Sequence, residues 1–174
     1  MYNNGGSGTS SPILTNCSFS GNSGDYGGGM YNDSRGGSSS PKLTNCLFST
    51  NVGAFGGGMY NDGRNSGTSS PTLTNCSFSG NVATAFGGAL YNNTSFPTLK
   101  NCILWGNNTE IENISGTSDV TYSIVQGGYP LSVSVGVAAS VALAGGGSAS
   151  LVHAADAALY QAKRNGRNRV EILQ

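Results

Sequence analysis

The feature that most constrains this chain is a tandem repeat of 29 to 31 residues. Met1-Tyr2-Asn3 returns as Met30-Tyr31-Asn32 and Met59-Tyr60-Asn61, and in a changed form as Leu90-Tyr91-Asn92. Between these triplets each unit carries a proline, a short apolar stretch and a glycine-rich turn. A repeat of this length predicts one supersecondary unit per copy, with the copies stacked on each other.

Each unit contains three short strand-like pieces separated by turns. A proline stands at the first residue of one predicted strand, where its missing N–H is tolerated: Pro12, Pro41, Pro71 and Pro97. A cysteine and the apolar residue two positions later alternate with other residues, which predicts that both face one side of a strand: Cys17 and Phe19, Cys46 and Phe48, Cys76 and Phe78, Cys102 and Leu104. One unit cannot bury this side alone, but stacked units form a continuous core.

The stacking predicts a mainly β fold. We expect a right-handed parallel β-helix of about four coils over residues 1–128, and a small C-terminal strand-helix-strand appendage over residues 129–174. Two columns of asparagine are expected at the turns, because asparagine accepts left-handed backbone angles and stacked amides can bond from coil to coil. The columns are Asn16, Asn45, Asn75 and Asn101, and Asn22, Asn51, Asn81 and Asn107.

The amino-acid composition indicates a folded protein and argues against one that binds nucleic acid. The chain has 28 glycines in 174 residues and only 9% charged residues, yet it also has eight Tyr, six Phe and one Trp at zero net charge. Disordered chains have few aromatic residues and a high net charge, so a folded chain is predicted. Eight basic residues against eight acidic ones also argue against a nucleic-acid-binding protein.

The four cysteines are predicted to be free, buried thiols. One cysteine per coil behaves as a small apolar residue in a stack, and the paired ligands of a zinc site are absent. Asp25, Asp33 and Asp62 do not recur at a spacing that is expected to bring them together. We therefore predict no metal site, no catalytic residue and no resident cofactor.

The sequence changes character near Pro130, where glycine and cysteine give way to alanine. A charge-free stretch covers residues 121–153 but is interrupted by Pro130 and by the glycines at 145–147, which favours two soluble strands and a loop over a membrane span. No basic segment with an apolar core follows Met1, so no secretion signal is expected in the chain as given.

Residues 1–116 resemble the parallel β-helix repeats of bacterial polymorphic outer-membrane proteins and related autotransporter adhesins. The matching residues are Pro71–Asn81, with the sequence PTLTNCSFSGN, and Gly56–Asn61, with the sequence GGGMYN. The resemblance implies a secreted or cell-surface scaffold for adhesion or display, with a carbohydrate or protein as its surface ligand.

Some families with this repeat are carbohydrate-active enzymes, which is an alternative function. Such an enzyme needs carboxylates clustered with basic groups. Residues 1–130 contain no histidine, and their basic residues are Arg35, Lys42, Arg64 and Lys100. We therefore predict a non-catalytic scaffold.

The C-terminal segment predicts a strand from Leu131, a helix over 152–162 and a strand over 168–173. Ser132–Ala138 and Ala155–Asn168 resemble the end of a GGDEF domain, the diguanylate cyclase family. The resemblance implies that Lys163 and Arg167 contact the phosphates of GTP, with Mg²⁺ as cofactor. Their i, i+4 spacing places both on one side of a helix end.

The Gly-Gly-Asp/Glu-Glu-Phe turn that names this family is absent, as is its upstream metal-binding aspartate. We therefore expect an inactive GGDEF remnant, in which the two cations lie favourably near a helix C-terminus. The alternative is a signalling protein that makes or binds cyclic di-GMP. Because the chain starts inside a repeat and ends in an unrelated family, a fused or truncated reading frame is also expected.

Overall fold

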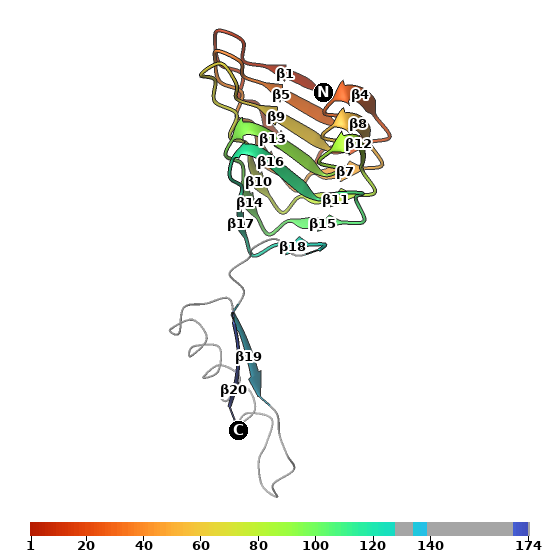
Figure 1. Ribbon diagram of the computed structural model, residues 1–174, viewed down its shortest axis with the longest axis vertical. Helices are drawn as coiled ribbons and strands as arrows, with labels where there is room; N and C mark the ends of the chain where they lie inside the picture. The colour runs from red at the N-terminus through yellow and green to blue at the C-terminus, as the bar shows by residue number, and fades with distance from the viewer. Residues whose placement is uncertain (128–133, 139–168, 174) are drawn as a thin grey trace, which may run out of the picture. The chain divides into compact units, whose positions relative to one another are not determined.

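The computed structural model describes residues 1–127, 134–138 and 169–173. The chain divides into two units, Met1–Tyr129 and Pro130–Gln174. In the first unit, parallel strands from successive repeats lie side by side and form a β-solenoid of about four turns (Figure 1). The predicted parallel β-helix is confirmed.

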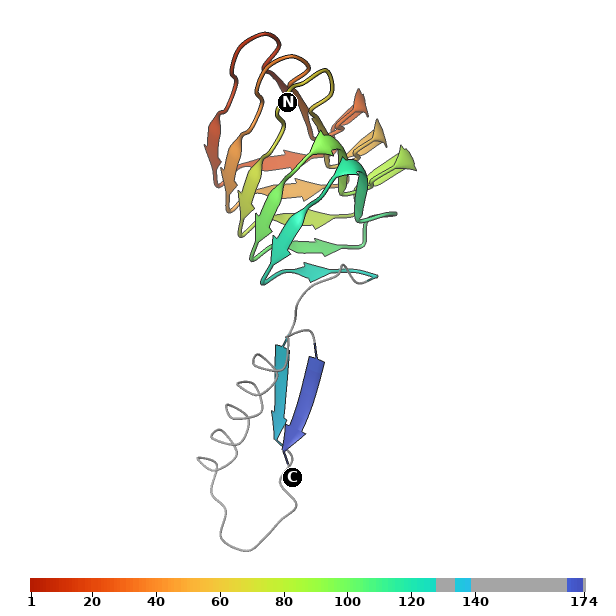
Figure 2. The same ribbon diagram turned by 60° about the vertical axis from the view of Figure 1, so that its left-hand side comes forward.

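Four parallel sheets extend along the solenoid, and Figure 2 shows their strands stacked coil by coil. Sheet 1 contains β1 (Tyr2–Asn4), β5 (Met30–Asp33), β9 (Met59–Asp62), β13 (Leu90–Ser95) and β16 (Ile111–Gly116). Sheet 2 contains β2 (Ile13–Thr15), β6 (Lys42–Thr44), β10 (Thr72–Thr74), β14 (Thr98–Lys100) and β17 (Asp119–Thr121). Sheet 3 contains β3 (Ser18–Ser20), β7 (Leu47–Ser49), β11 (Ser77–Ser79), β15 (Ile103–Trp105) and β18 (Ile124–Val125). Sheet 4 contains β4 (Ser23–Tyr26), β8 (Val52–Phe55) and β12 (Val82–Phe86).

The sheets correct two details of the sequence prediction. The first three coils each have four strands, not three, because the segment before each glycine-rich bend forms β4, β8 and β12. The prolines lie one residue before their strands. There the carbonyl of Pro12 accepts the amide of Lys42 at 2.9 Å, and the carbonyl of Pro41 accepts that of Thr72 at 3.0 Å, so the coils remain bonded where proline itself cannot donate.

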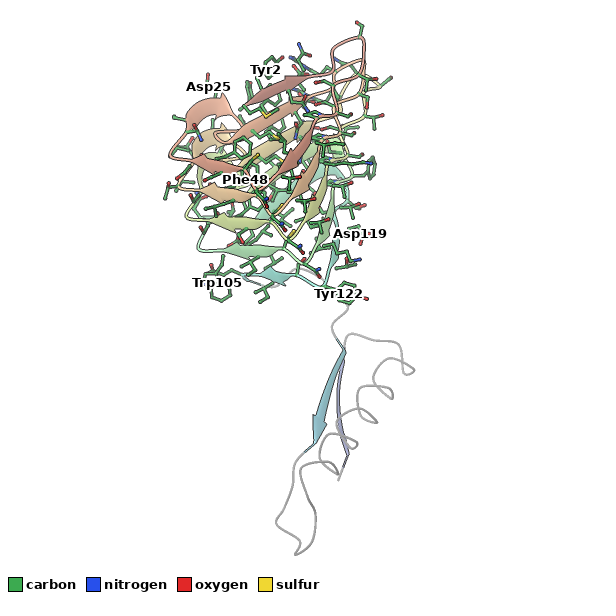
Figure 3. The ribbon with its side chains drawn as sticks, turned by 180° about the vertical axis from the view of Figure 1, so that it is seen from behind. Tyr2, Asp25, Phe48, Trp105, Asp119 and Tyr122 are labelled. Atoms are coloured by element: carbon green, nitrogen blue, oxygen red, sulfur yellow. The ribbon has the colours of Figure 1, made fainter. Side chains whose placement is uncertain are left out.

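The core consists of identical or similar residues stacked along the solenoid. The rings of Phe19, Phe48 and Phe78 stack with successive centroids 4.6 Å apart. Figure 3 places Phe48 inside the coils. The four cysteines are free thiols, three buried and Cys17 half-buried. Each cysteine follows the asparagine of the bend and does not lie in one strand with the Phe or Leu two positions later. This corrects the predicted alternation, yet both side chains still reach the core.

Both predicted asparagine columns are present. Asn16, Asn45, Asn75 and Asn101 have positive φ angles of 54 to 56°, and their exposed amides bond across coils at 3.1 to 3.2 Å. In the other column, the amides of Asn22, Asn51, Asn81 and Asn107 bond at 2.8 to 3.0 Å. A third column, which the sequence did not predict, joins Asn3, Asn32, Asn61, Asn92 and Asn113 at 2.7 to 3.0 Å inside the solenoid.

In the second unit, β19 (Ser134–Ala138) pairs in parallel with β20 (Arg169–Leu173). Both strands lie where the sequence predicts them, and the predicted helix over 152–162 lies outside the described residues. Within the part of the chain that the structure describes, no helix has the length and apolar character needed to cross a membrane.

Candidate functional site

Two columns of aromatic rings meet on the outside of the solenoid. Tyr2, Tyr31, Tyr60 and Tyr91 project outward from sheet 1, because they alternate with inward residues such as Met30. Their ring centroids are 5.0 to 5.3 Å apart. Sheet 4 contributes the second column, Tyr26, Phe55 and Phe86. We call these seven residues the aromatic corner.

Glycines bring the two columns into contact. Gly27, Gly56 and Gly87 connect sheet 4 to sheet 1 with positive φ angles of 58 to 70°. A Cβ at Gly27 would lie 2.0 Å from the carbonyl oxygen of Met30, so only glycine fits this bend. The tight bend brings the ring of Tyr26 to 5.6 Å from that of Tyr31.

The rings differ in solvent exposure, which distinguishes those that only pack from those that a ligand can reach. Tyr60 and Tyr91 are 2% and 7% exposed, whereas Tyr26, Phe86 and Tyr2 are 48%, 51% and 58% exposed. Tyr2 also lines two shallow depressions of about 320 and 380 Å³. One depression also contains Asp33 and Arg35, and the other contains residues of β4 and the following glycines. The inner rings therefore support an accessible aromatic rim.

Paired charges lie beside the aromatic corner. Arg35 donates to both carboxylate oxygens of Asp33 from Nε at 2.8 Å and from Nη2 at 2.6 Å. Arg64 does the same to Asp62 at 2.9 and 2.7 Å. Asp33 and Asp62 are register partners on β5 and β9, so one ion pair lies above the other. The Arg35 Nε is also 3.8 Å from the Asp62 carboxylate.

Tyrosine hydroxyls join these ion pairs to the rings. The hydroxyl of Tyr2 donates to Asp33 at 2.8 Å, and that of Tyr31 donates to Asp62 at 3.3 Å. Hydrogen bonds from the Arg35 side chain lower the pKa of Asp33 to about 2. Burial opposes the ionisation of Asp62, but the hydrogen bonds from Arg64 outweigh it and lower this pKa as well. Both carboxylates therefore remain ionised at neutral pH.

This arrangement can bind a ligand, but it is poorly suited to acid–base catalysis. Exposed rings offer apolar contact, and the arginine side chains, which are nearly half exposed, add planar guanidinium donors at the rim. A carboxyl group with a lowered pKa is a poor general acid near neutral pH. Among the described residues, there is no group of three or more His, Cys, Asp or Glu side chains that could hold a metal ion.

The residues singled out from the sequence fall into three groups. Arg35 and Arg64 lie together at this site, whereas Lys42 and Lys100 are exposed on sheet 2. Lys163 and Arg167, the predicted phosphate contacts, lie outside the described residues.

The expectation that the aspartates do not come together is wrong for Asp33 and Asp62. Their spacing equals the repeat, which places them on adjacent strands. The signal is Asp-Ser-Arg over 33–35 and Asp-Gly-Arg over 62–64. Sequence analysis also missed the aromatic residue before each glycine-rich bend, Tyr26, Phe55 and Phe86.

Comparison with known proteins finds no matching family model, no matching curated protein and no matching solved structure. The solenoid fold is therefore supported by the parallel strand pairing of the structure itself. The resemblances to polymorphic outer-membrane proteins and to the GGDEF domain remain predictions from the sequence.

Proposed function

We propose that this chain is a non-catalytic β-solenoid scaffold of a secreted or cell-surface protein, which binds a surface ligand in adhesion or display. The aromatic corner with its flanking Asp–Arg pairs is the observation that carries the proposal. Outward side chains on a solenoid need only be polar for the fold to form, so exposed rings at Tyr2, Tyr26 and Phe86 are left available for contact with a ligand.

The chemistry of the corner favours a carbohydrate as the ligand. A sugar presents apolar C–H surfaces together with hydroxyl groups that both donate and accept hydrogen bonds. The corner offers aromatic surface at Tyr26, and the adjoining depression adds the guanidinium of Arg35 and the amides of Asn4 and Asn65. Binding sites of this type combine apolar contact with a few convergent polar groups. A protein ligand is the other outcome that the test below distinguishes.

The charges of the corner support a binding role over hydrolysis. A glycosidase uses one carboxyl group with a raised pKa as acid and a second carboxylate as base or nucleophile. Asp33 and Asp62 both have lowered pKa values and each is paired with its own arginine. Asp33 and Asp62 therefore serve to hold Arg35 and Arg64 in place.

The test is binding of the purified chain to an array of immobilised glycans and to surface proteins, with Tyr26→Ala and Phe86→Ala as variants. We expect glycan binding that weakens in both variants, while Tyr122→Asn, an exposed aromatic residue on another part of the solenoid, leaves it unchanged. Binding to proteins alone would show that the ligand is a protein and not a carbohydrate. Absence of any binding, binding that survives both variants, or cleavage of a polysaccharide would refute the proposal.

A further inference from the structure

One side of the solenoid has no charge. The segments 16–24, 45–54, 75–84, 101–109 and 122–127 contain no Asp, Glu, Lys or Arg. They form sheet 3, the asparagine bend before it and the start of sheet 4. We call their outer surface the uncharged face. The other sheets carry charges, for example Lys42 on sheet 2 and Asp33 on sheet 1.

The uncharged face also carries many of the exposed large apolar side chains of the solenoid. These are Leu47, Val52, Val82, Ile103, Trp105, Tyr122 and Ile124, all at least 40% exposed. Trp105 is 56% exposed at the position that is serine in the preceding coils. Figure 3 shows Trp105 and Tyr122 on the outside of the coils at the end of the solenoid away from Tyr2. Charges normally keep such sheet surfaces from associating, and here they are absent.

From this surface we infer that the uncharged face pairs with the same face of a second copy of this chain. Self-pairing brings no like charges together and leaves no charge desolvated. On sheet 3 the large and small residues also lie mostly at opposite ends, with Leu47 of the second coil as the exception. Ser18, Ser20 and Ser49 belong to the first two coils, whereas Ile103, Trp105 and Ile124 belong to the last two.

A two-fold axis parallel to the strands makes these ends complementary. It places β3 of one copy over β18 of the other, β7 over β15, and β11 over itself. Trp105 then lies over Ser49, and Ile124 over Ser18, while Ile103 and Leu47 face each other as an apolar pair. Neighbouring strands of sheet 3 pair without a shift in register, which keeps the surface regular enough for this packing. The contact is isologous and closes as a dimer.

The small size of the face limits how stable the dimer can be. Five strands at about 4.8 Å span about 20 Å, and about eight residues across span about 25 Å, which gives an area on the order of 500 Å² per copy. A standard stable interface buries about 800 Å² per partner. We therefore expect a weak dimer that is in equilibrium with the monomer.

Sedimentation velocity over a range of concentrations tests the pairing. The wild-type chain should pass from monomer to dimer. Ser79→Asp places two carboxylates close to the two-fold axis and should weaken the dimer about tenfold or more. Thr72→Asp is the matched control, because it adds the same charge to the same coil on the outer face of sheet 2. Trp105→Ser restores the serine of the preceding coils and should weaken the dimer to a similar degree.

Trp105 is the only tryptophan of the chain, so its fluorescence reports on the face directly. Emission should move to shorter wavelength as concentration rises in the wild type and in Thr72→Asp, and should stay constant in Ser79→Asp. The inference would be overturned if the wild-type chain remained monomeric at all concentrations. It would also be overturned if Ser79→Asp left the dimer unchanged, or if Ser79→Asp and Thr72→Asp weakened it equally.

Discussion

At the scale of single residues, Asn81 shows how the solenoid satisfies polar groups in its interior. Its Nδ2 donates to the carbonyl of Phe48 at 3.0 Å and to Oδ1 of Asn107 at 2.8 Å. Its Oδ1 accepts the backbone amide and the side-chain amide of Asn51 at 3.1 and 2.9 Å. Every bonding group of this buried amide is used, so it bonds three coils together.

Asn81→Asp should therefore be severely destabilising. The change removes two donors and buries a charge, which should lower the free energy of unfolding by about 3 kcal/mol or more in urea titrations at neutral pH. Asn45→Asp is the matched control, because Asn45 is exposed and aspartate also tolerates its φ of 55°. Equal losses in both variants would contradict this account of the buried column.

Asp33 predicts a dependence of stability on acid pH. Its pKa is about 2 in the folded chain, because Arg35 and Tyr2 donate hydrogen bonds to the carboxylate. The unfolded value is about 3.9, so the ionised group contributes stability that is fully present above that pH and is lost as the pH falls through about 2. Chemical denaturation between neutral pH and pH 2 should show the loss. Asp33→Asn should be less stable at neutral pH and should lose less on acidification, and a parallel pH profile in the variant would contradict the assignment.

At the scale of the coil, Tyr122 departs from the rule that the other coils follow. It occupies the bend before β18 with a φ of 51°, where the preceding coils have asparagine. A non-glycine residue other than asparagine or aspartate pays a steric cost in this region. Tyr122 is 83% exposed, so packing within the chain does not offset that steric cost.

Replacing Tyr122 by Asn should therefore raise the free energy of unfolding by about 1 kcal/mol, because it relieves the backbone and extends the exposed asparagine column by one coil. Thermal unfolding followed by circular dichroism measures the change. Tyr122→Phe keeps the backbone cost and should leave stability unchanged. A stabilisation of equal size in Tyr122→Phe would point to the hydroxyl and contradict the argument.

The coils also show where sequence reasoning succeeds. Residues that recur in every unit, such as the leucine at 43 and the asparagines at the bends, could be assigned because periodicity alone places them on one column. Strand β4 was missed because Ser-Gly-Asp, its first three residues, have low strand propensity and the strand pairs only with the next coil. Asp33 and Arg35 were missed as a site because their motif occurs in only two units.

At the scale of the whole molecule, the C-terminal segment predicts no nucleotide binding of its own. Two cations that meet a phosphate in water supply only about 1 kcal/mol each, while millimolar affinity needs about 4 kcal/mol. Isothermal titration should detect no binding of GTP tighter than millimolar, with no change when Lys163 and Arg167 are both replaced by Ala. Micromolar affinity that is lost in this double variant would show that the segment retains a nucleotide site.

The central claim is that successive repeats stack in register as coils of one parallel solenoid. The most direct measurement is nuclear Overhauser contacts between phenylalanine rings in a selectively labelled sample. We expect contacts between Phe19 and Phe48 and between Phe48 and Phe78, whose ring centroids are 4.6 Å apart although the residues are 29 and 30 positions apart in sequence. Absence of both contacts in a folded chain, or contacts only between sequence neighbours, would contradict the solenoid.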